Sequence, residues 1–218
     1  MSLSITVRGT AEEIYPAERA IVDVAVAIEG EDRAAVAAEA GTLLAPLTEQ
    51  LGQLHDRQVV TSWSAGQVRV FSHRPTDHEG RRLAVVHVAR VEITAEFADF
   101  ERLSGFVDFW SGREGVEIVG LRWDVAAKNR RVYEAEVRRA AVDDAVQKAQ
   151  GYANAVRRGR VVPVEFADPG MLSSQPDAPT PMYARVSADM GGGGSGIAVT
   201  PEPIVVSAAV DARFTTDT

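Results

Sequence analysis

The sequence of 218 residues contains no cysteine. This absence excludes a disulfide framework, a zinc site built from thiolates and a cysteine nucleophile. Lysine is nearly absent as well, because only Lys128 and Lys148 stand against 21 arginines. No apolar run approaches the roughly 20 residues that a membrane-spanning helix needs, so we expect no membrane span.

What is present is the composition of an ordinary globular chain, with 45% apolar and 25% charged residues. The net charge of -8 disfavours nucleic acid and anionic lipid as partners, because phosphate contacts need a basic surface. The N-terminus lacks the basic and apolar segments of a secretory signal. We therefore expect a cytoplasmic protein as the sequence stands, and a periplasmic or secreted one if a leader precedes it.

Alternating apolar residues predict seven strands. The clearest is Arg19–Glu29, in which Val22, Val24, Val26 and Ile28 face one way. In Val116–Asp124 the alternation places Val119, Leu121 and Trp123 on the inward face. The remaining predicted strands are Leu3–Val7, Arg57–Phe71, Leu83–Phe97, Val161–Ala167 and Pro203–Phe214.

Helical spacing of apolar residues predicts three helices. Asp32 caps the first, and Pro46 is expected to kink or divide it. Its apolar stripe comprises Val36, Ala40, Leu43, Leu44, Leu47, Leu51 and Leu54. Asp99 caps a shorter helix, and Ala126–Arg157 is the longest. The predicted buried side of the longest helix comprises Val132, Tyr133, Val137, Ala140, Ala141, Ala145, Ala149, Tyr152 and Val156.

The order of these elements predicts the fold class. Strands come in adjacent runs between helices rather than in strict β-α-β alternation, which favours α+β. We expect largely antiparallel sheets packed against a long C-terminal helix and two shorter helices. The predicted organisation is one domain over 1–218, with lobes at about 1–97 and 98–214. A proline- and glycine-rich loop at 168–200 is expected to be mobile.

The glycines at 191, 193 and 196 match the spacing G-x-G-x-x-G. In dinucleotide-binding proteins this motif follows a strand and opens a helix, so that the phosphates meet a helix N-terminus. Here a proline-rich stretch precedes the motif and a strand follows it. We interpret 191–196 as a flexible linker and expect no cofactor.

His73, Asp77, His78 and Glu79 form one cluster with metal-binding side chains. Two imidazoles and a carboxylate can bind zinc, but these residues lie in a turn with Pro75 between them. Such spacing fixes no common face, so the cluster is typical of a solvated loop. We predict no metal site.

No spacing in the chain points to catalytic residues. The motifs G-x-S-x-G and H-E-x-x-H are both missing. Neighbouring carboxylates diverge on a helix or strand, and are therefore interpreted as solvated charges rather than acid–base pairs. These carboxylates are Glu12-Glu13, Glu134 with Glu136, and Asp143-Asp144. The tryptophans Trp63, Trp110 and Trp123 fall on apolar faces, which predicts core packing.

Charge is unevenly distributed along the sequence. The segment Lys128–Arg160 holds nine basic and four acidic residues, a local charge of +5, which leaves -13 for the rest. A basic helix can bind nucleic acid, but the acidic balance of the whole chain favours a protein surface as the partner.

Several short motifs in a fixed order resemble the SIMPL-domain family. They are Ile5–Glu12, Tyr15-Pro16-Ala17, Val59–Ser62, Ala140–Ala149, Tyr152-Ala153 and Pro203–Val210. The similarity spans about Ser4 to Phe214. The resemblance implies an α+β domain that forms homo-oligomers, with no accepted catalytic residues to carry over. Bacterial relatives are linked to oxidative-stress defence and to periplasmic immunogenic proteins. The chain departs from the family pattern at Ala17 and at Glu202-Pro203.

Two functional hypotheses follow. The first is a non-enzymatic, self-assembling SIMPL-domain protein that acts as a scaffold or binding module in stress protection, with itself or another protein as partner. The alternative is a small-molecule-binding domain or enzyme with its pocket between the helices and the sheet. A large apolar subunit interface would favour the first hypothesis, and a buried pocket with converging polar groups would favour the second.

Overall fold

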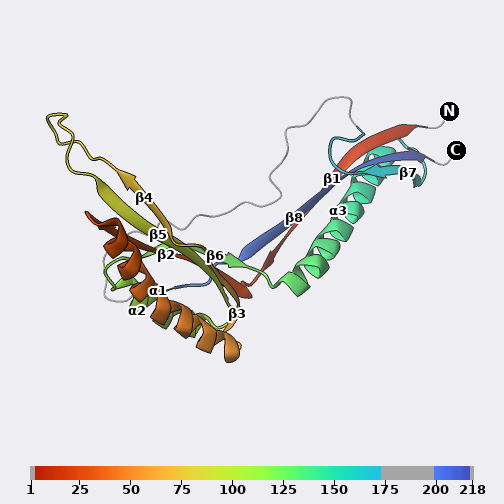
Figure 1. The fold of residues 1–218 in the computed structure, drawn as a ribbon. Coiled ribbons are helices and arrows are strands. Elements are labelled where there is room, and N and C mark those ends of the chain that lie inside the picture. Colours follow the sequence, from red (N-terminus) through yellow and green to blue (C-terminus); the bar gives the residue numbers. More distant parts are fainter. Residues whose placement is uncertain (1–2, 173–198, 217–218) are drawn as a thin grey trace. The chain divides into compact units, whose positions relative to one another are not determined.

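The computed structural model describes residues 3–172 and 199–216 (Figure 1). Within these residues the chain is α+β, as predicted, with three helices and eight strands. The strands are β1 (Ser4–Tyr15), β2 (Arg19–Gly30), β3 (Val60–Ala65), β4 (Arg69–His73), β5 (Val86–Phe97), β6 (Val116–Asp124), β7 (Val161–Ala167) and β8 (Ile204–Thr216). The helices are α1 (Arg33–Asp56), α2 (Phe100–Ser111) and α3 (Ala127–Ala155). No described helix combines the length and apolarity needed to cross a membrane.

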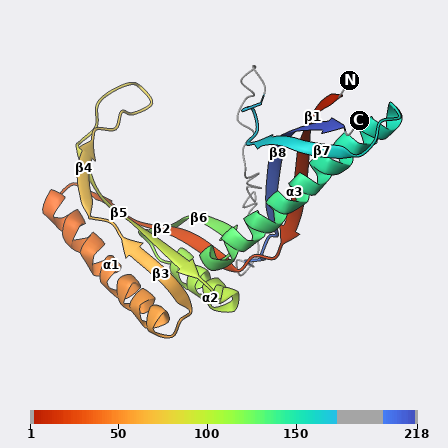
Figure 2. The same cartoon turned by 90° about the vertical axis from the view of Figure 1, so that its right-hand side faces the viewer.

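The strands form two sheets, and every strand pair is antiparallel, as predicted. One sheet has the order β1-β8-β7. The other has the order β3-β5-β2-β6, and β4 also pairs with β5. Figure 2 shows both sheets from a second side.

The two sheets belong to two compact units. Of the described residues, unit 1 contains 3–16, 125–172 and 203–216, and unit 2 contains 17–124 and 199–202. These units are interleaved in the sequence, whereas the lobes expected from the sequence, 1–97 and 98–214, are consecutive. The reason is that β1 pairs with β8 along its whole length, so both ends of the chain enter one unit. The expected mobile loop at 168–200 lies mostly in 173–198, outside the described residues.

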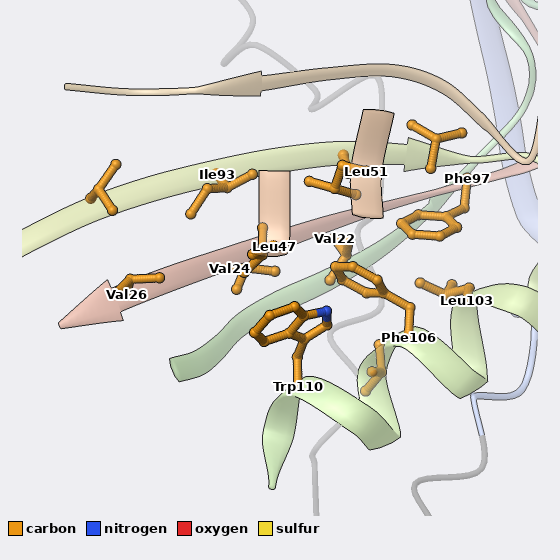
Figure 3. Packing of buried hydrophobic residues seen from close by; sticks show 14 of the residues in the cluster. Val22, Val24, Val26, Leu47, Leu51, Ile93, Phe97, Leu103, Phe106 and Trp110 are labelled. Atoms are coloured by element: carbon orange, nitrogen blue, oxygen red, sulfur yellow. The ribbon is translucent and has the colours of Figure 1, made fainter. Parts of the chain in front are cut away.

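The core of unit 2 lies between its sheet and the helices α1 and α2 (Figure 3). On β2 the alternation is confirmed, because Val22, Val24, Val26 and Ile28 are all buried. Phe106 contacts Phe97 with ring centroids 5.2 Å apart. The largest fully buried side chains of this core come from β2, α1, β3, β5 and α2: Phe97, Phe106, Leu47, Leu51, Ile93, Leu103, Val22, Val24, Val26, Val60 and Val91.

Helix α1 begins where the sequence predicts. The Asp32 side chain accepts hydrogen bonds from the backbone N–H groups of Ala34 and Ala35. Of the two effects expected of Pro46, a kink or a division, the division does not occur, because α1 runs unbroken from Arg33 to Asp56. Leu47 and Leu51 directly after Pro46 are fully buried, and this burial outweighs the backbone hydrogen bond that proline removes.

Three strand predictions need correction. β1 does not end at Val7 but continues to Tyr15, because β8 pairs with it throughout. The single strand predicted over Arg57–Phe71 is two strands, β3 and β4, which pair with different parts of β5. Val119 is not inward but 50% exposed. The register of β2 with β6 shifts at this point, since Asp23 is opposite Gly120 and Val24 is opposite Ile118, so Val119 is the extra residue of a β-bulge.

In unit 1, α3 packs against the sheet through small side chains. Its buried residues are Val137, Ala141, Ala145, Ala149 and Ala153. A Cβ at Gly9 of β1 would lie 2.0 Å from the Ala141 carbonyl oxygen and 2.7 Å from the Ala145 Cβ. The helix therefore lies directly against the backbone of the strand, at a distance that requires glycine.

The predicted buried side of α3 is only partly correct. Val132, Tyr152 and Val156 are 52%, 62% and 57% exposed. The buried residues recur strictly every fourth position, so the contact row turns slowly around the helix. The prediction assumed one straight apolar stripe along the helix. It therefore included Val132, Tyr152 and Val156 near the two ends, which the sheet does not cover.

Candidate interaction surface

Of the four residues with metal-binding side chains named from the sequence, His73 is the last residue of β4, and Asp77, His78 and Glu79 lie in the loop between β4 and β5. The carboxylates of Asp77 and Glu79 form hydrogen bonds and an ion pair within this loop. Asp77 Oδ1 accepts hydrogen bonds from the backbone N–H groups of Glu79 (2.9 Å) and Arg81 (2.8 Å), and Glu79 pairs with Arg81 at 2.6 Å. In the described part of the chain no three His, Cys, Asp or Glu residues are grouped so that they could hold a metal ion. The glycine motif at 191–196 lies outside the described residues.

In two of the three carboxylate pairs named from the sequence, one carboxylate binds a group outside the pair. Glu136 accepts a hydrogen bond from the Tyr15 hydroxyl at 3.3 Å. Burial and the nearby Glu136 carboxylate raise the pKa of Tyr15. Asp144 Oδ2 instead binds Lys148 Nζ at 2.6 Å and the Thr10 N–H at 2.8 Å, and these bonds lower the pKa of Asp144.

The prediction of core packing is confirmed for the three tryptophans. Trp110 is 3% exposed, and its Nε1–H donates to Gln50 Oε1 at 2.7 Å. Trp63 and Trp123 are partly buried against the same core. Trp123 meets Phe100 edge to face, with ring centroids 4.8 Å apart.

A buried carboxylate that the sequence analysis missed lies on β8. Asp211 is 5% exposed and is opposite Arg8 of β1. Arg8 Nε and Nη2 donate to its two oxygens at 2.7 and 3.2 Å, and the Gly170 N–H donates to Oδ2 at 2.7 Å. The Arg8 hydrogen bond, and after it the Gly170 bond, lower the pKa of Asp211 although burial opposes them. With both oxygens bonded, this carboxylate is an anchor for the chain after β7 rather than a general base.

A second polar network joins four strands of unit 2, namely β2, β3, β5 and β6. Arg19 on β2 binds Glu96 of β5 at 2.5 Å and Asp124 of β6 at 2.7 Å. Burial disfavours the charged guanidinium, but the bonds to Asp124 and Glu96 prevail and raise the pKa of Arg19. Glu96 also accepts a hydrogen bond from the Thr61 hydroxyl. This network links neighbouring strands, and both of its carboxylates are bound to other side chains.

Both edges of the unit 1 sheet are protected against further strands. On β1, the Arg8 carbonyl oxygen accepts a hydrogen bond from Lys148 Nζ at 3.1 Å, and the Thr10 N–H donates to the Asp144 carboxylate. Side chains of α3 therefore occupy backbone groups in the middle of this edge. On β7, Pro163 lacks a donor and the register with β8 shifts between Pro163 and Glu165. Charged caps, proline and irregular register are the usual protections of edge strands.

The outward side of α3 carries exposed basic and apolar side chains. Six of the nine basic residues of the segment Lys128–Arg160 lie on this helix. Arg130 and Lys148 form ion pairs with residues four positions away on the same helix, at 3.9 Å to Glu134 and 2.6 Å to Asp144. The exposed arginines at 131, 138 and 139 form no ion pair with any described residue. Exposed valines at 132 and 146 lie among them.

One shallow hollow in unit 2 lies between α1 and α2. Its volume is about 310 Å³, and it is lined by Gln50, Leu54, Glu101, Arg102, Gly105 and Phe106. Phe106 is buried, while the Arg102 and Glu101 side chains are exposed. The hollow therefore has an apolar floor and a charged rim, without the enclosure typical of small-molecule sites.

Comparison with known proteins gives a family and no activity. The chain matches the model of the SIMPL family, described as a protein of unknown function (DUF541), over residues 5–214. None of the curated proteins matches the chain. The match extends from the second residue of β1 to Phe214 of β8 and so includes both units. The chain belongs to the SIMPL family.

Proposed function

We propose that this protein is a non-enzymatic, self-assembling scaffold whose assembly uses the outward side of α3. The observation that supports it is the mixture, on this helix, of exposed valines and of arginines that form no ion pair with a described residue. Val132 is 52% and Val146 38% exposed, and Arg138 and Arg139 lie on the same helix between them. Apolar side chains with unpaired cations are a common composition of protein interfaces.

The charge of the chain supports a second copy as the partner. Residues 17–124 carry 18 acidic residues against 11 arginines, a net charge of -7. The basic side of α3 and this acidic unit are complementary between two copies, and such complementarity steers association and sets specificity. Protection of both edges of the unit 1 sheet further favours a helix face over strand pairing as the contact.

Sedimentation velocity of the full chain from about 1 to 100 μM tests this proposal. We expect a reversible increase in mass with concentration, weakened by salt because the contact is partly ionic. A protein that stays monomeric across this range would refute the proposal.

A second candidate is a small-molecule-binding role for unit 2, for which the open hollow between α1 and α2 is the site to test. Its polar groups are the Gln50 amide, the Glu101 carboxylate and the Arg102 guanidinium. Gly105 lines the hollow and a Cβ there meets nothing within 4 Å, so Gly105→Leu should reduce the volume of the hollow. A ligand found by screening that binds the parent equally well after Gly105→Leu would not occupy this hollow.

A further inference from the structure

The outward side of α3 has a spacing that a second helix can match. Val132, Ala135, Arg139, Val142 and Val146 follow one another at steps of three and four residues. All but Val142, which is partly buried, are exposed. Steps of three and four place side chains in one row along a helix, the pattern by which two helices pack at a small angle. We call these five residues the α3 row.

Unit 2 carries a row with the same steps on the outward side of α1. Ala35, Ala38, Thr42, Ala45 and Glu49 are all exposed, and Figure 2 shows α1 along the outside of its unit. The Thr42 hydroxyl donates to the Ala38 carbonyl oxygen at 3.0 Å, so its methyl group is the part left for contact. We call these five residues the α1 row. Small side chains in a row leave room for the valines of the α3 row.

The charges beside the two rows are opposite. Arg131 and Arg138 flank the α3 row, which itself contains Arg139, and none of the three forms an ion pair with a described residue. From Ala34 to Asp56, α1 contains three acidic residues and no lysine or arginine. Glu39 is exposed beside the α1 row and has no partner among the described residues.

We infer that the α3 row of one copy docks on the α1 row of a second copy. The inference rests on the proposed self-assembly and specifies its two surfaces. Two α3 rows would bring arginine against arginine, and two α1 rows would bring carboxylate against carboxylate, so the charges favour the unlike pair. The contact is then heterologous, because each copy offers one surface of each kind, and successive copies extend into a ring or a filament.

Two variants of the full chain separate the surfaces. Variant A carries Arg138→Glu and Arg139→Glu, and variant B carries Glu39→Arg and Glu49→Arg. Each should raise the dissociation constant of self-association at least about tenfold, because like charges then face each other. The controls change net charge equally away from the rows: Arg157→Glu with Arg160→Glu for A, and Glu31→Arg with Glu114→Arg for B. The controls should stay within about threefold of the parent.

Mixing the variants gives the decisive measurement. Variant A keeps an intact α1 row and variant B keeps an intact α3 row, so an equimolar mixture contains one native contact for each A–B pair. We expect sedimentation to show mixed A–B assemblies at concentrations where neither variant associates alone, because the native contact remains and the reversed charges of A and B also complement each other. Circular dichroism melting of each variant confirms that it is folded.

The outcomes distinguish this inference from the proposed function. A parent that self-associates while B behaves like its control overturns the α1 row and leaves the proposed function standing. Loss of association in A and B without mixed A–B assemblies also overturns the inference. A monomeric parent overturns both.

Discussion

Arg8 and Asp211 lie directly opposite each other on β1 and β8 and are joined by two hydrogen bonds, of 2.7 and 3.2 Å. The Asp211 side chain is 7% exposed and that of Arg8 is 37% exposed. The same carboxylate holds the Gly170 backbone N–H. One side chain thus connects the two end strands of the chain and the segment that follows β7.

Replacing this carboxylate should change stability and its dependence on pH. Arg8, and after it Gly170, lower the pKa of Asp211 in the folded protein below the unfolded value of about 3.9. The stabilisation is therefore present above about pH 4 and is lost as pH falls through the lower folded pKa. Asp211→Asn should lower the free energy of unfolding by roughly 1–3 kcal/mol at pH 7. The free energy of unfolding of the variant should also fall less steeply than that of the parent as the pH is lowered.

Urea unfolding between pH 7 and pH 3 measures both effects. The control is Glu165→Gln on β7, which removes a 3.0 Å pair with Arg213 whose side chains are 41% and 47% exposed. Its cost should be at most about 1 kcal/mol. An Asp211→Asn variant that loses stability on acidification as steeply as the parent would contradict the assignment.

Gly9→Ala should destabilise unit 1 strongly. Its new Cβ would lie 2.0 Å from the Ala141 carbonyl oxygen, and a backbone atom of a helix cannot move aside cheaply. The expected loss is about 1–3 kcal/mol or more, as for other overpacked sites. The control is Gly120→Ala on β6, whose Cβ meets nothing within 4 Å. Equal urea midpoints for the two variants would show that α3 does not lie against β1 at this distance.

Leu47→Ala should cost roughly 2–5 kcal/mol, since it removes buried methyl groups and leaves a cavity. Leu47 is fully buried in the unit 2 core. The exposed Gln53 on the same helix provides the comparison, and Gln53→Ala should stay within about 0.5 kcal/mol of the parent. A loss below about 1 kcal/mol for Leu47→Ala in urea unfolding would place the residue outside the core.

Removing the side chains that cap the β1 edge should promote irreversible aggregation. Asp144→Ala with Lys148→Ala frees the Thr10 N–H and the Arg8 carbonyl oxygen on that edge, and open edges recruit further strands. Light scattering during incubation at 37 °C should rise faster than for the parent. The control, Glu79→Ala with Arg81→Ala, removes an exposed ion pair that caps no strand. Equal rates for the two variants would be evidence against an edge cap.

The sequence predicted those elements whose apolar spacing or capping residue is determined by residues close by in the chain. β2 alternates throughout because one face meets the core, and Asp32 and Asp99 cap their helices through local hydrogen bonds. The bulge at Val119 was not predictable, since it depends on the register of β6 against β2. Nor was the exposure of Tyr152, which depends on how far the sheet extends beneath α3.

The candidate surface was predictable in charge but not in shape. The excess of arginine over 128–160 is visible in the sequence, and so is the spacing of the pairs at 130–134 and 144–148. Which cations lack a partner depends on packing. The Arg8–Asp211 pair was invisible, because it joins residues 203 positions apart and no local pattern marks an ion pair between strands.

The pairing of β1 with β8 also sets the timing of folding during synthesis. β1 is made before every other described element, whereas β8, which pairs with it along its whole length, is made after all of them. Residues 17–124, which form nearly all of unit 2, are made before any of α3. Domains tend to fold as units when their residues are available, and contacts across long separations form slowly. Unit 2 can therefore form most of its core while β1 still lacks its partner strand, because β8 is made after every other described element.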